Sequence, residues 1–449
     1  MMRLYLSLAV AIIAFASCQK DVEVNITPKP QVSVETTSTR SYDEALKVAE
    51  DAIELLEGEN TRSAKKRIIK RSEGQTVIRP VTRGSEATEE PIMYVFNYEN
   101  DEGFAIVAAD RSQQPLIAVT EQGNYTYGEP TGVEPFDILI EEVATTLSFG
   151  PPATPTPTPN PNLPLDPRPI YYVDTVDIFT RVDPLLTTKW GQRGIYNDLC
   201  LNDQSQECPA GCVATALAQI MAYNRHPSQI QITFDGDYYG DILYLNWTDI
   251  LKHTWSYGLH TGCTSEHNNI SILFREIGER VDMEYTPSGS STYETDALNF
   301  LKQIGFTAAK LTNGMSYALT QLNLREGKPV YMRGERYVAT SGSYIGHGWV
   351  ADGVHDREYG TNTYELNPNY DPSIIYNNPE PEYIITESNI QIERMLHFNW
   401  GYDGECNGWF ATDNICMIEA VEYDDNAYNS IYDRDYKYSM SIIYDISIW

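Results

Sequence analysis

The chain has 449 residues, and 63 acidic against 32 basic side chains give it a formal net charge of -31. This charge argues against nucleic acid as a partner, because phosphate binding needs clustered Lys and Arg side chains, and it disfavours adhesion to anionic lipid by charge alone. Hydrophobic residues make up 42% of the chain, which is too many for a disordered protein. At about 150–250 residues per domain, the length favours two domains.

The first 18 residues predict a lipoprotein signal peptide. A short basic start, Met1–Arg3, precedes an apolar run over residues 4–16. A run of roughly 13 residues is too short to span a bilayer, which takes about 20, and is typical of the core of a signal peptide. Small residues before Cys18 are similar to the bacterial lipoprotein pattern, in which this cysteine receives the lipid. We therefore expect an exported protein at the outer membrane or cell surface, in contact with the membrane only through its lipid anchor, or else plainly secreted.

Residues 19–149 predict a small α+β domain. Ser41 can cap a helix, and Glu44 three residues later completes a capping box ahead of apolar residues at helical spacing. A Gly-containing turn separates two apolar runs and indicates a hairpin. In chain order the patterns predict a helix over 41–58, strands over 91–98 and 104–108, and a helix over 135–147.

Residues 150–169 (GPPATPTPTPNPNLPLDPRP) predict a linker between the two domains. Repeated proline fixes φ and removes backbone donors, so this stretch forms neither a helix nor a central strand. We expect it to be extended and accessible to proteases. The second domain, residues 170–449, predicts helices over 211–224, 270–280 and 293–305, strands from 307 and 329, and antiparallel sheet over the final 100 residues. This mixture predicts the α+β fold class.

Seven cysteines limit the disulfide pattern. With Cys18 lipidated and Cys212 kept as a free thiol, five remain, so pairing would be incomplete. An exported protein meets an oxidising compartment, where the local pairs Cys200–Cys208 and Cys406–Cys416 would close short loops. None of the spacings is that of a zinc site, and no metal is expected.

Cys212 stands at the start of the helix predicted over 211–224, directly after Pro209-Ala210-Gly211. The positive end of a helix dipole stabilises a thiolate and lowers the thiol pKa. The small residues before it leave room for a substrate backbone. A buried structural cysteine would explain the position equally well, so position alone leaves both interpretations open.

A thiolate nucleophile needs a base, and two histidines are candidates. His226 lies 14 residues after Cys212 in the same predicted helix, about 21 Å along its axis, and cannot reach. His347 stands between glycines that leave its imidazole bare, on a strand that runs into a turn. His397 shares a strand face with Asn399, which would orient an imidazole as the third member of a Cys–His–Asn arrangement. Spacing favours His347 slightly and leaves His397 open.

Four motifs follow one another in the second domain: TKWGQ at 188–192, GCVATALAQIM at 211–221, HGWVADG at 347–353 and NWGYDG at 399–404. In this order they resemble the streptopain family, bacterial papain-like cysteine peptidases that are made as zymogens. The resemblance covers roughly residues 183–412. The segment FAIVAAD at 104–110 is also similar to the inhibitory propeptide of that family. The resemblance implies a papain-like catalytic domain with a helical subdomain and an antiparallel-sheet subdomain, preceded by a smaller propeptide domain.

Carried over to this sequence, the resemblance makes Cys212 the nucleophile and His347 its acid/base partner. The side chain of Gln192 and the backbone N–H of Cys212 would form the oxyanion hole. Asn399 would orient His347, and Trp400 would cover that contact and keep water out. No metal or organic cofactor is implied. The expected partners are protein or peptide substrates, and the chain's own propeptide as intramolecular inhibitor.

Two departures from the family pattern affect the surroundings of the site. Gly348 follows the histidine where alanine is commoner, and residues 402–404 replace an aromatic residue followed by two glycines. Asp403 therefore adds a negative charge that bears on substrate preference. Ser290 and Gly346 are candidates for lining the substrate groove. With His347 as the base, His397 becomes a structural strand residue.

Two other functions compete with the peptidase. One is a catalytically inactive surface lipoprotein that binds peptide through a retained fold. The other is a transglutaminase-like acyl transferase that uses the same Cys–His pair. A thiol-directed peptidase inhibitor would label an active enzyme faster than a model thiol, and a binder would show no such advantage.

Overall fold

The computed structural model describes residues 38–57, 67–78, 90–149, 171–234, 238–252, 264–307, 309–314, 316–338, 343–367, 383–412 and 439–448. The predicted signal peptide, the lipidation of Cys18 and the predicted linker lie outside these residues. Within these ranges, no helix has the length and apolar character needed to cross a membrane.

The chain forms two compact units. Of the described residues, the smaller unit contains 171–177, 359–367 and 383–390. These belong to β5 (Tyr171–Val182), β12 (Ser343–Leu366) and β13 (Tyr383–Ser388). Strand β12 pairs with both β5 and β13. The larger unit contains the rest of the described chain, including every predicted catalytic residue.

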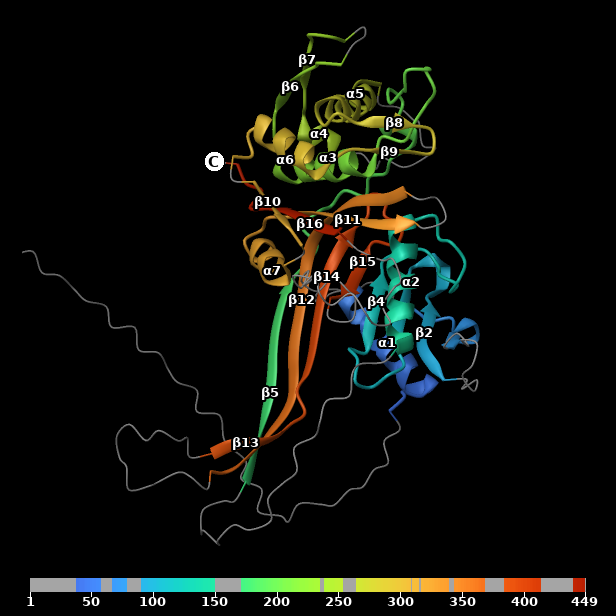
Figure 1. Ribbon diagram of the computed structural model, residues 1–449, viewed down its shortest axis with the longest axis vertical. Helices are drawn as coiled ribbons and strands as arrows, with labels where there is room; N and C mark the ends of the chain where they lie inside the picture. The colour runs from blue at the N-terminus through green and yellow to red at the C-terminus, as the bar shows by residue number, and fades with distance from the viewer. Residues whose placement is uncertain are drawn as a thin grey trace, which may run out of the picture. The chain divides into compact units, whose positions relative to one another are not determined.

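The N-terminal part of the larger unit is an antiparallel sheet between two helices (Figure 1). Alternate residues of β2 face opposite sides, as the two-residue period of a strand requires. Tyr94 and Phe96 pack against α1, whereas Met93 and Val95 pack against α2. The elements are α1 (Tyr42–Glu57), η1 (Arg71–Glu73), β1 (Gln75–Ile78), β2 (Pro91–Asn97), η2 (Glu99–Asp101), β3 (Phe104–Ala108), β4 (Leu116–Thr120) and α2 (Glu134–Phe149).

A helical part follows, and its core is built around the buried helix α3. This helix begins at Cys212 and ends at Asn224, because Arg225 adopts the left-handed conformation at φ 50°. His226 therefore lies beyond this helix, not within it as predicted. The elements are η3 (Gly194–Tyr196), α3 (Cys212–Asn224), β6 (Gln229–Gln231), β7 (Ile242–Tyr244), α4 (Trp247–Ile250), α5 (Thr264–Arg280), β8 (Glu284–Thr286), β9 (Gly289–Ser291) and α6 (Glu294–Gln303). Helix α7 (Tyr317–Arg325) instead packs on the strands β11 and β16 of the large sheet.

A single sheet joins the N-terminal strands to the C-terminal ones, in the order β1-β2-β3-β4-β15-β14-β12-β11-β16-β10. Figure 1 shows β4 alongside β15, and their antiparallel register pairs Val119 with Trp409. The fold is α+β, as predicted, with an antiparallel sheet over the C-terminal strands. The remaining elements are β10 (Lys310–Asn313), β11 (Val330–Val338), β14 (Gln391–Asn399), β15 (Gly408–Ala411) and β16 (Ser439–Tyr444).

The cysteines that the structure describes are free thiols, so the predicted Cys200–Cys208 disulfide is wrong for this structure. The two backbones do meet, since the Cys208 N–H donates to the Cys200 carbonyl at 2.8 Å. Each thiol instead faces another carbonyl: Cys200 faces that of Tyr196 and Cys208 that of Gln206. Burial raises the pKa of Cys200 to about 12, which keeps it protonated. Cys406 is also free, and its predicted partner lies outside the described residues.

Candidate active site

Cys212 is the first residue of α3, at the positive end of the helix dipole. The chain enters this helix through Gly211, whose φ of +95° lies in the left-handed region that favours glycine. A Cβ at this position would also lie 2.8 Å from Cε of Met283. Both observations explain why glycine precedes the cysteine.

His347 on β12 is the imidazole that reaches Cys212. The next residue, Gly348, donates its N–H to the Cys212 Sγ atom at 3.3 Å. Burial alone would raise the pKa of Cys212, but the His347 imidazole and the Gly348 N–H outweigh it and lower the pKa. Burial likewise opposes the charged imidazole, yet the thiolate and the Trp400 carbonyl raise the pKa of His347. The geometry therefore favours a thiolate–imidazolium pair.

Aromatic side chains enclose the imidazole of His347. Trp349 stacks on it with ring centroids 6.3 Å apart and an interplanar angle of 12°. Trp400 and Tyr402 lie at 6.4 and 5.5 Å. These rings fix the orientation of the imidazole and exclude water from its far side.

The backbone of Trp400 holds the second imidazole nitrogen. The Nε2 atom of His347 lies 2.9 Å from the Trp400 carbonyl oxygen, which accepts its proton. Asn399 bonds elsewhere: its amide nitrogen donates to the Thr188 carbonyl at 2.8 Å, and its amide oxygen accepts the Gly401 N–H at 3.2 Å. Asn399 is therefore attached to the loop that carries the acceptor of the His347 proton.

Gln219 completes the hydrogen bonding of Asn399. The two amides bond reciprocally, with N···O distances of 3.0 and 3.2 Å, and both residues are buried. The Gln219 oxygen also accepts the Trp190 N–H at 3.2 Å. Gln219 lies seven residues after Cys212, so the two share a face of α3. The sequence signal for this residue is a glutamine on the apolar face of the helix predicted over 211–224.

Gln192 lies on the segment that α3 holds in place. The Thr215 hydroxyl donates to the Gly191 carbonyl at 3.1 Å, and the Ala210 N–H donates to the Gln192 carbonyl at 2.9 Å. Burial raises the pKa of Tyr402, and the nearby Gln192 side chain opposes this shift. The predicted oxyanion donor and Tyr402 thus meet at the same site as His347.

Asp403 brings its carboxyl group against the same segment. A Cβ at Gly191 would collide with the Asp403 carboxyl, so only glycine allows this approach. Burial and the nearby Glu405 raise the pKa of Asp403 to about 6. The charge predicted near the site is therefore present and titrates close to neutral pH.

Ser290 and Gly346 occupy different places around the pair. The Ser290 hydroxyl donates to the Pro209 carbonyl at 2.7 Å and thereby holds the turn that leads into α3. Gly346 is exposed, and a Cβ there would lie 3.3 Å from Nη2 of Arg333. The positive charge of Arg333 also lowers the pKa of Cys212, a contribution that the sequence did not indicate.

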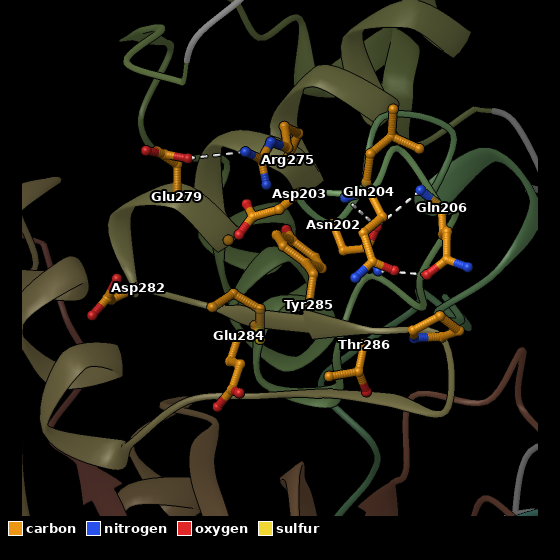
Figure 2. A pocket seen from close by; sticks show the side chains of 14 residues that line it. Asn202, Asp203, Gln204, Gln206, Arg275, Glu279, Asp282, Glu284, Tyr285 and Thr286 are labelled. Carbon is orange, nitrogen blue, oxygen red and sulfur yellow. Dashed lines mark hydrogen bonds and ion pairs between the residues drawn. The ribbon is translucent and has the colours of Figure 1, made fainter.

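A separate pocket of about 580 Å³ opens between the 201–206 turn, α5 and the β8–β9 hairpin. Figure 2 shows Arg275 paired with Glu279 on one side of it and Asn202 bonded to Gln206 on the other. Its lining residues include neither Cys212 nor His347. The cysteine chemistry therefore does not take place in this pocket.

Both the N-terminal and the C-terminal regions of the chain match known protein families. The sequence model of the peptidase C10 family matches residues 190–410, and that of the Spi protease inhibitor matches residues 31–146. Residues 190–410 belong to the peptidase C10 family. This C10 region contains Gln192, Cys212, His347, Asn399 and Trp400, and the Spi-type region (residues 31–146) precedes it.

Known C10 relatives are distant in sequence. The thiol protease/hemagglutinin PrtT of Porphyromonas gingivalis is 24% identical over 341 residues, which are 72% of this chain and 34% of that protein. Streptopain of Streptococcus pyogenes is 23% identical over 348 residues, 72% of this chain and 74% of that protein. The chain thus spans about a third of the first relative and about three quarters of the second.

Two solved structures are similar to this chain. A fragment of Prevotella intermedia prointerpain A superposes with a TM-score of 0.48 at 21% identity, covering 83% of this chain and 98% of that one. Active wild-type interpain A from the same organism gives a TM-score of 0.37 at 21% identity, covering 59% and 95%.

The Spi-type region shares a core with the C10 region. Phe136 on α2 is fully buried and packs edge-on against Phe410 of β15, with ring centroids 6.2 Å apart. The same hydrophobic cluster contains Trp349 and Trp400, two of the rings around His347. At the strand contact, a Cβ on Gly408 would lie 2.2 Å from the Val119 carbonyl oxygen, so β4 approaches β15 closely only because residue 408 is glycine.

Proposed function

We propose that the chain is the zymogen of a papain-like cysteine endopeptidase that hydrolyses peptide bonds through Cys212 and His347. One observation carries the proposal: the Cys212 Sγ atom, at the start of α3, accepts the Gly348 N–H beside His347, and the two side chains shift each other's pKa toward the charged pair. Such a thiolate is the reactive form of cysteine at neutral pH.

In the proposed reaction, the Cys212 thiolate attacks the carbonyl carbon of the scissile bond. The negative charge that develops on the carbonyl oxygen is stabilised by the Cys212 N–H and the Gln192 amide, donors worth about 3–4 kcal/mol each in such sites. The His347 imidazolium gives its proton to the leaving amine. It then takes one from water, which hydrolyses the acyl-enzyme.

Asn399 and Trp400 act on His347 in this proposal by fixing its orientation. The Trp400 carbonyl accepts the Nε2 proton, and Asn399 holds the surrounding loop through Gln219 and Gly401. The Trp400 ring covers the contact. Asn399 thus orients His347 indirectly: it positions the backbone of Trp400, whose carbonyl bonds to the imidazole.

The Spi-type region is the proposed inhibitory propeptide. Three features support this role: α2 packs on the aromatic cluster beside His347, β4 extends the catalytic sheet, and the negative charge of Glu134 acts on both His347 and Tyr402. A carboxylate beside the imidazole stabilises its cationic form without offering a scissile bond. Cleavage within the predicted linker, 150–169, would precede release.

Polypeptides are the proposed substrates, bound along a groove that Ser290 and Gly346 line. Ser290 already fixes the turn before Cys212, so a bound chain in contact with it would pass close to the nucleophile. Export and a lipid on Cys18 remain predictions from the sequence.

The decisive experiment compares purified precursor with its Cys212→Ala variant. Wild type is expected to generate new N-termini near the linker and then to digest casein, whereas the variant should do neither. A wild type that matures no faster than the variant and digests no protein contradicts the proposal. Cross-linking of amines to glutamine without cleavage would point to the acyl transferase.

A further inference from the structure

A cluster of four charges spans the contact between the Spi-type and C10 regions. His397, on β14, places its Nδ1 atom 2.6 Å from Asp352 and its Nε2 atom 3.4 Å from Glu121. Lys189 places its Nζ atom 2.6 Å from the other Glu121 oxygen. Glu121 belongs to the Spi-type region, and the other three residues belong to the C10 sequence or its flank. None of the four takes part in the proposed chemistry.

The protein holds His397 as a buried cation. The side chain is 4% exposed, yet its pKa is raised to about 9, because Asp352 and Glu121 outweigh the burial that opposes its charge. Asp352 is fixed in turn, since one of its carboxylate oxygens accepts the Leu186 N–H at 3.0 Å. Asp352 therefore fixes the orientation of the imidazole, and the Nε2 edge forms an ion pair with Glu121 without a hydrogen bond.

Glu121 enters this cluster at the end of a strand. It directly follows β4, and its N–H donates to the Asn407 carbonyl at 2.8 Å, which extends the contact with the β15 side by one residue. The two cations lower the pKa of Glu121 to about 2 against the opposing effect of burial. Its carboxylate is therefore ionised throughout the physiological range.

The charges balance only when Glu121 is present. Lys189 and His397 carry two positive charges, and Asp352 and Glu121 carry two negative ones. Without Glu121, one positive charge remains uncompensated at a largely buried position, and breaking such a contact is strongly unfavourable. A neutral side chain in place of Glu121 would remove the negative charge that lies 3.4 Å from the His397 Nε2 atom.

We propose that Lys189, His397 and Asp352 form a carboxylate-binding site of the C10 domain, and that its ligand is the side chain of Glu121 at the end of β4. The ligand class is a carboxylate that immediately follows an extended strand paired to β15. The proposal rests on the proposed function in taking the Spi-type region as the propeptide. It assigns to His397 the recognition of this region.

Hydrogen exchange on the full chain in a Cys212→Ala background tests the site without any measurement of activity. Glu121→Gln keeps the shape and removes the charge, so amides of β4 and β15 should exchange about ten- to a hundredfold faster. Glu129→Gln, at an exposed propeptide position, is the matched control and should leave these rates unchanged. Glu121→Asp, which keeps the charge on a shorter side chain, should give an intermediate rate.

Lys189→Met tests whether the faster amide exchange of Glu121→Gln arises from the loss of the proposed carboxylate-binding contact. Alone it should accelerate the same amides, and combined with Glu121→Gln it should add much less than its separate effect, because both changes remove one interaction. Equal rates for Glu121→Gln and Glu129→Gln, or additive effects of Glu121→Gln and Lys189→Met, overturn the proposal. Equal acceleration in β11, away from this contact, also overturns it, since the site would then support the whole fold.

Discussion

Asn399 and Gln219, which are 180 residues apart in the sequence, form a reciprocal pair of amide hydrogen bonds beneath the catalytic pair. Through this pair, the helix that carries Cys212 is connected to the loop whose carbonyl accepts the His347 proton. The same glutamine holds the Trp190 N–H, two residues before Gln192. The proposed nucleophile, base and oxyanion donor therefore depend on one buried side chain for their relative positions.

Replacing Gln219 with leucine should destabilise the protein by about 2–4 kcal/mol, because the Asn399 amide and the Trp190 N–H lose their partners in a buried place. Denaturant unfolding in the Cys212→Ala background measures this loss. Gln204→Leu, at an exposed position, is the control and should stay within about 0.5 kcal/mol of the parent. A loss as small for Gln219→Leu as for the control would show that the amide pair contributes little.

The reactivity of Cys212 should show its lowered pKa. In wild-type protein the rate of alkylation by iodoacetamide should reach half its maximum below the ordinary thiol pKa. His347→Ala removes the imidazole that favours the thiolate, so the midpoint should move to higher pH. An unchanged midpoint would mean that the imidazole does not stabilise the thiolate. Cys200, whose pKa is raised to about 12, serves as an internal unreactive thiol.

Asp403 should make stability depend on pH. Because its folded-state pKa of about 6 lies above the ordinary value of 3.8, folding favours the protonated form. This contribution is complete below about pH 4 and is lost as the pH rises through 6. Asp403→Asn should therefore gain stability relative to wild type between pH 5 and pH 7.5, as melting temperatures at the two values would show. A constant difference between the two proteins would contradict the assignment.

Phe136 should couple propeptide stability to inhibition. Phe136→Ala opens a cavity in the shared core and should cost about 3–5 kcal/mol. It should also raise the activity of the uncleaved precursor, because α2 would hold the aromatic cluster beside His347 less firmly. Activity is measured on a small peptide substrate before any linker cleavage is visible. Phe179→Ala, at a side chain that is 50% exposed, is the control for loss of an aromatic ring.

Elements governed by local chemistry were predictable from the sequence. The Ser41 N–H donates to the Glu44 carboxylate at 2.8 Å, so the expected capping box begins α1. The helix with Cys212 follows its expected glycine, and the strands over 91–98 and 104–108 form the expected hairpin within a residue of the predicted ends. Each of these signals lies within a few residues of the structure that it determines.

Pairings between distant residues were not predictable in the same way. Strand periodicity placed His397 and Asn399 on one face, but it carried no information that Asp352 and Glu121 would surround the histidine. The two side chains that looked like partners therefore bond to different parts of the chain. Residue spacing hardly discriminates between His347 and His397 as the base. The order of the four motifs is what favours His347. The junction of β4 with β15 likewise has no local signal.

The pairing of β4 with β15 has a consequence for the activated enzyme. When the propeptide departs, the backbone N–H and C=O groups of Gly408–Phe410 that faced it lose their partners, and the Lys189 and His397 cations lose the charge of Glu121. A newly bared strand of this kind is a template for any extended polypeptide. Maturation thus exposes an unpaired edge strand on the enzyme. A substrate or a second enzyme molecule could pair with this strand, and an acidic residue directly after the pairing segment would suit the neighbouring cations best.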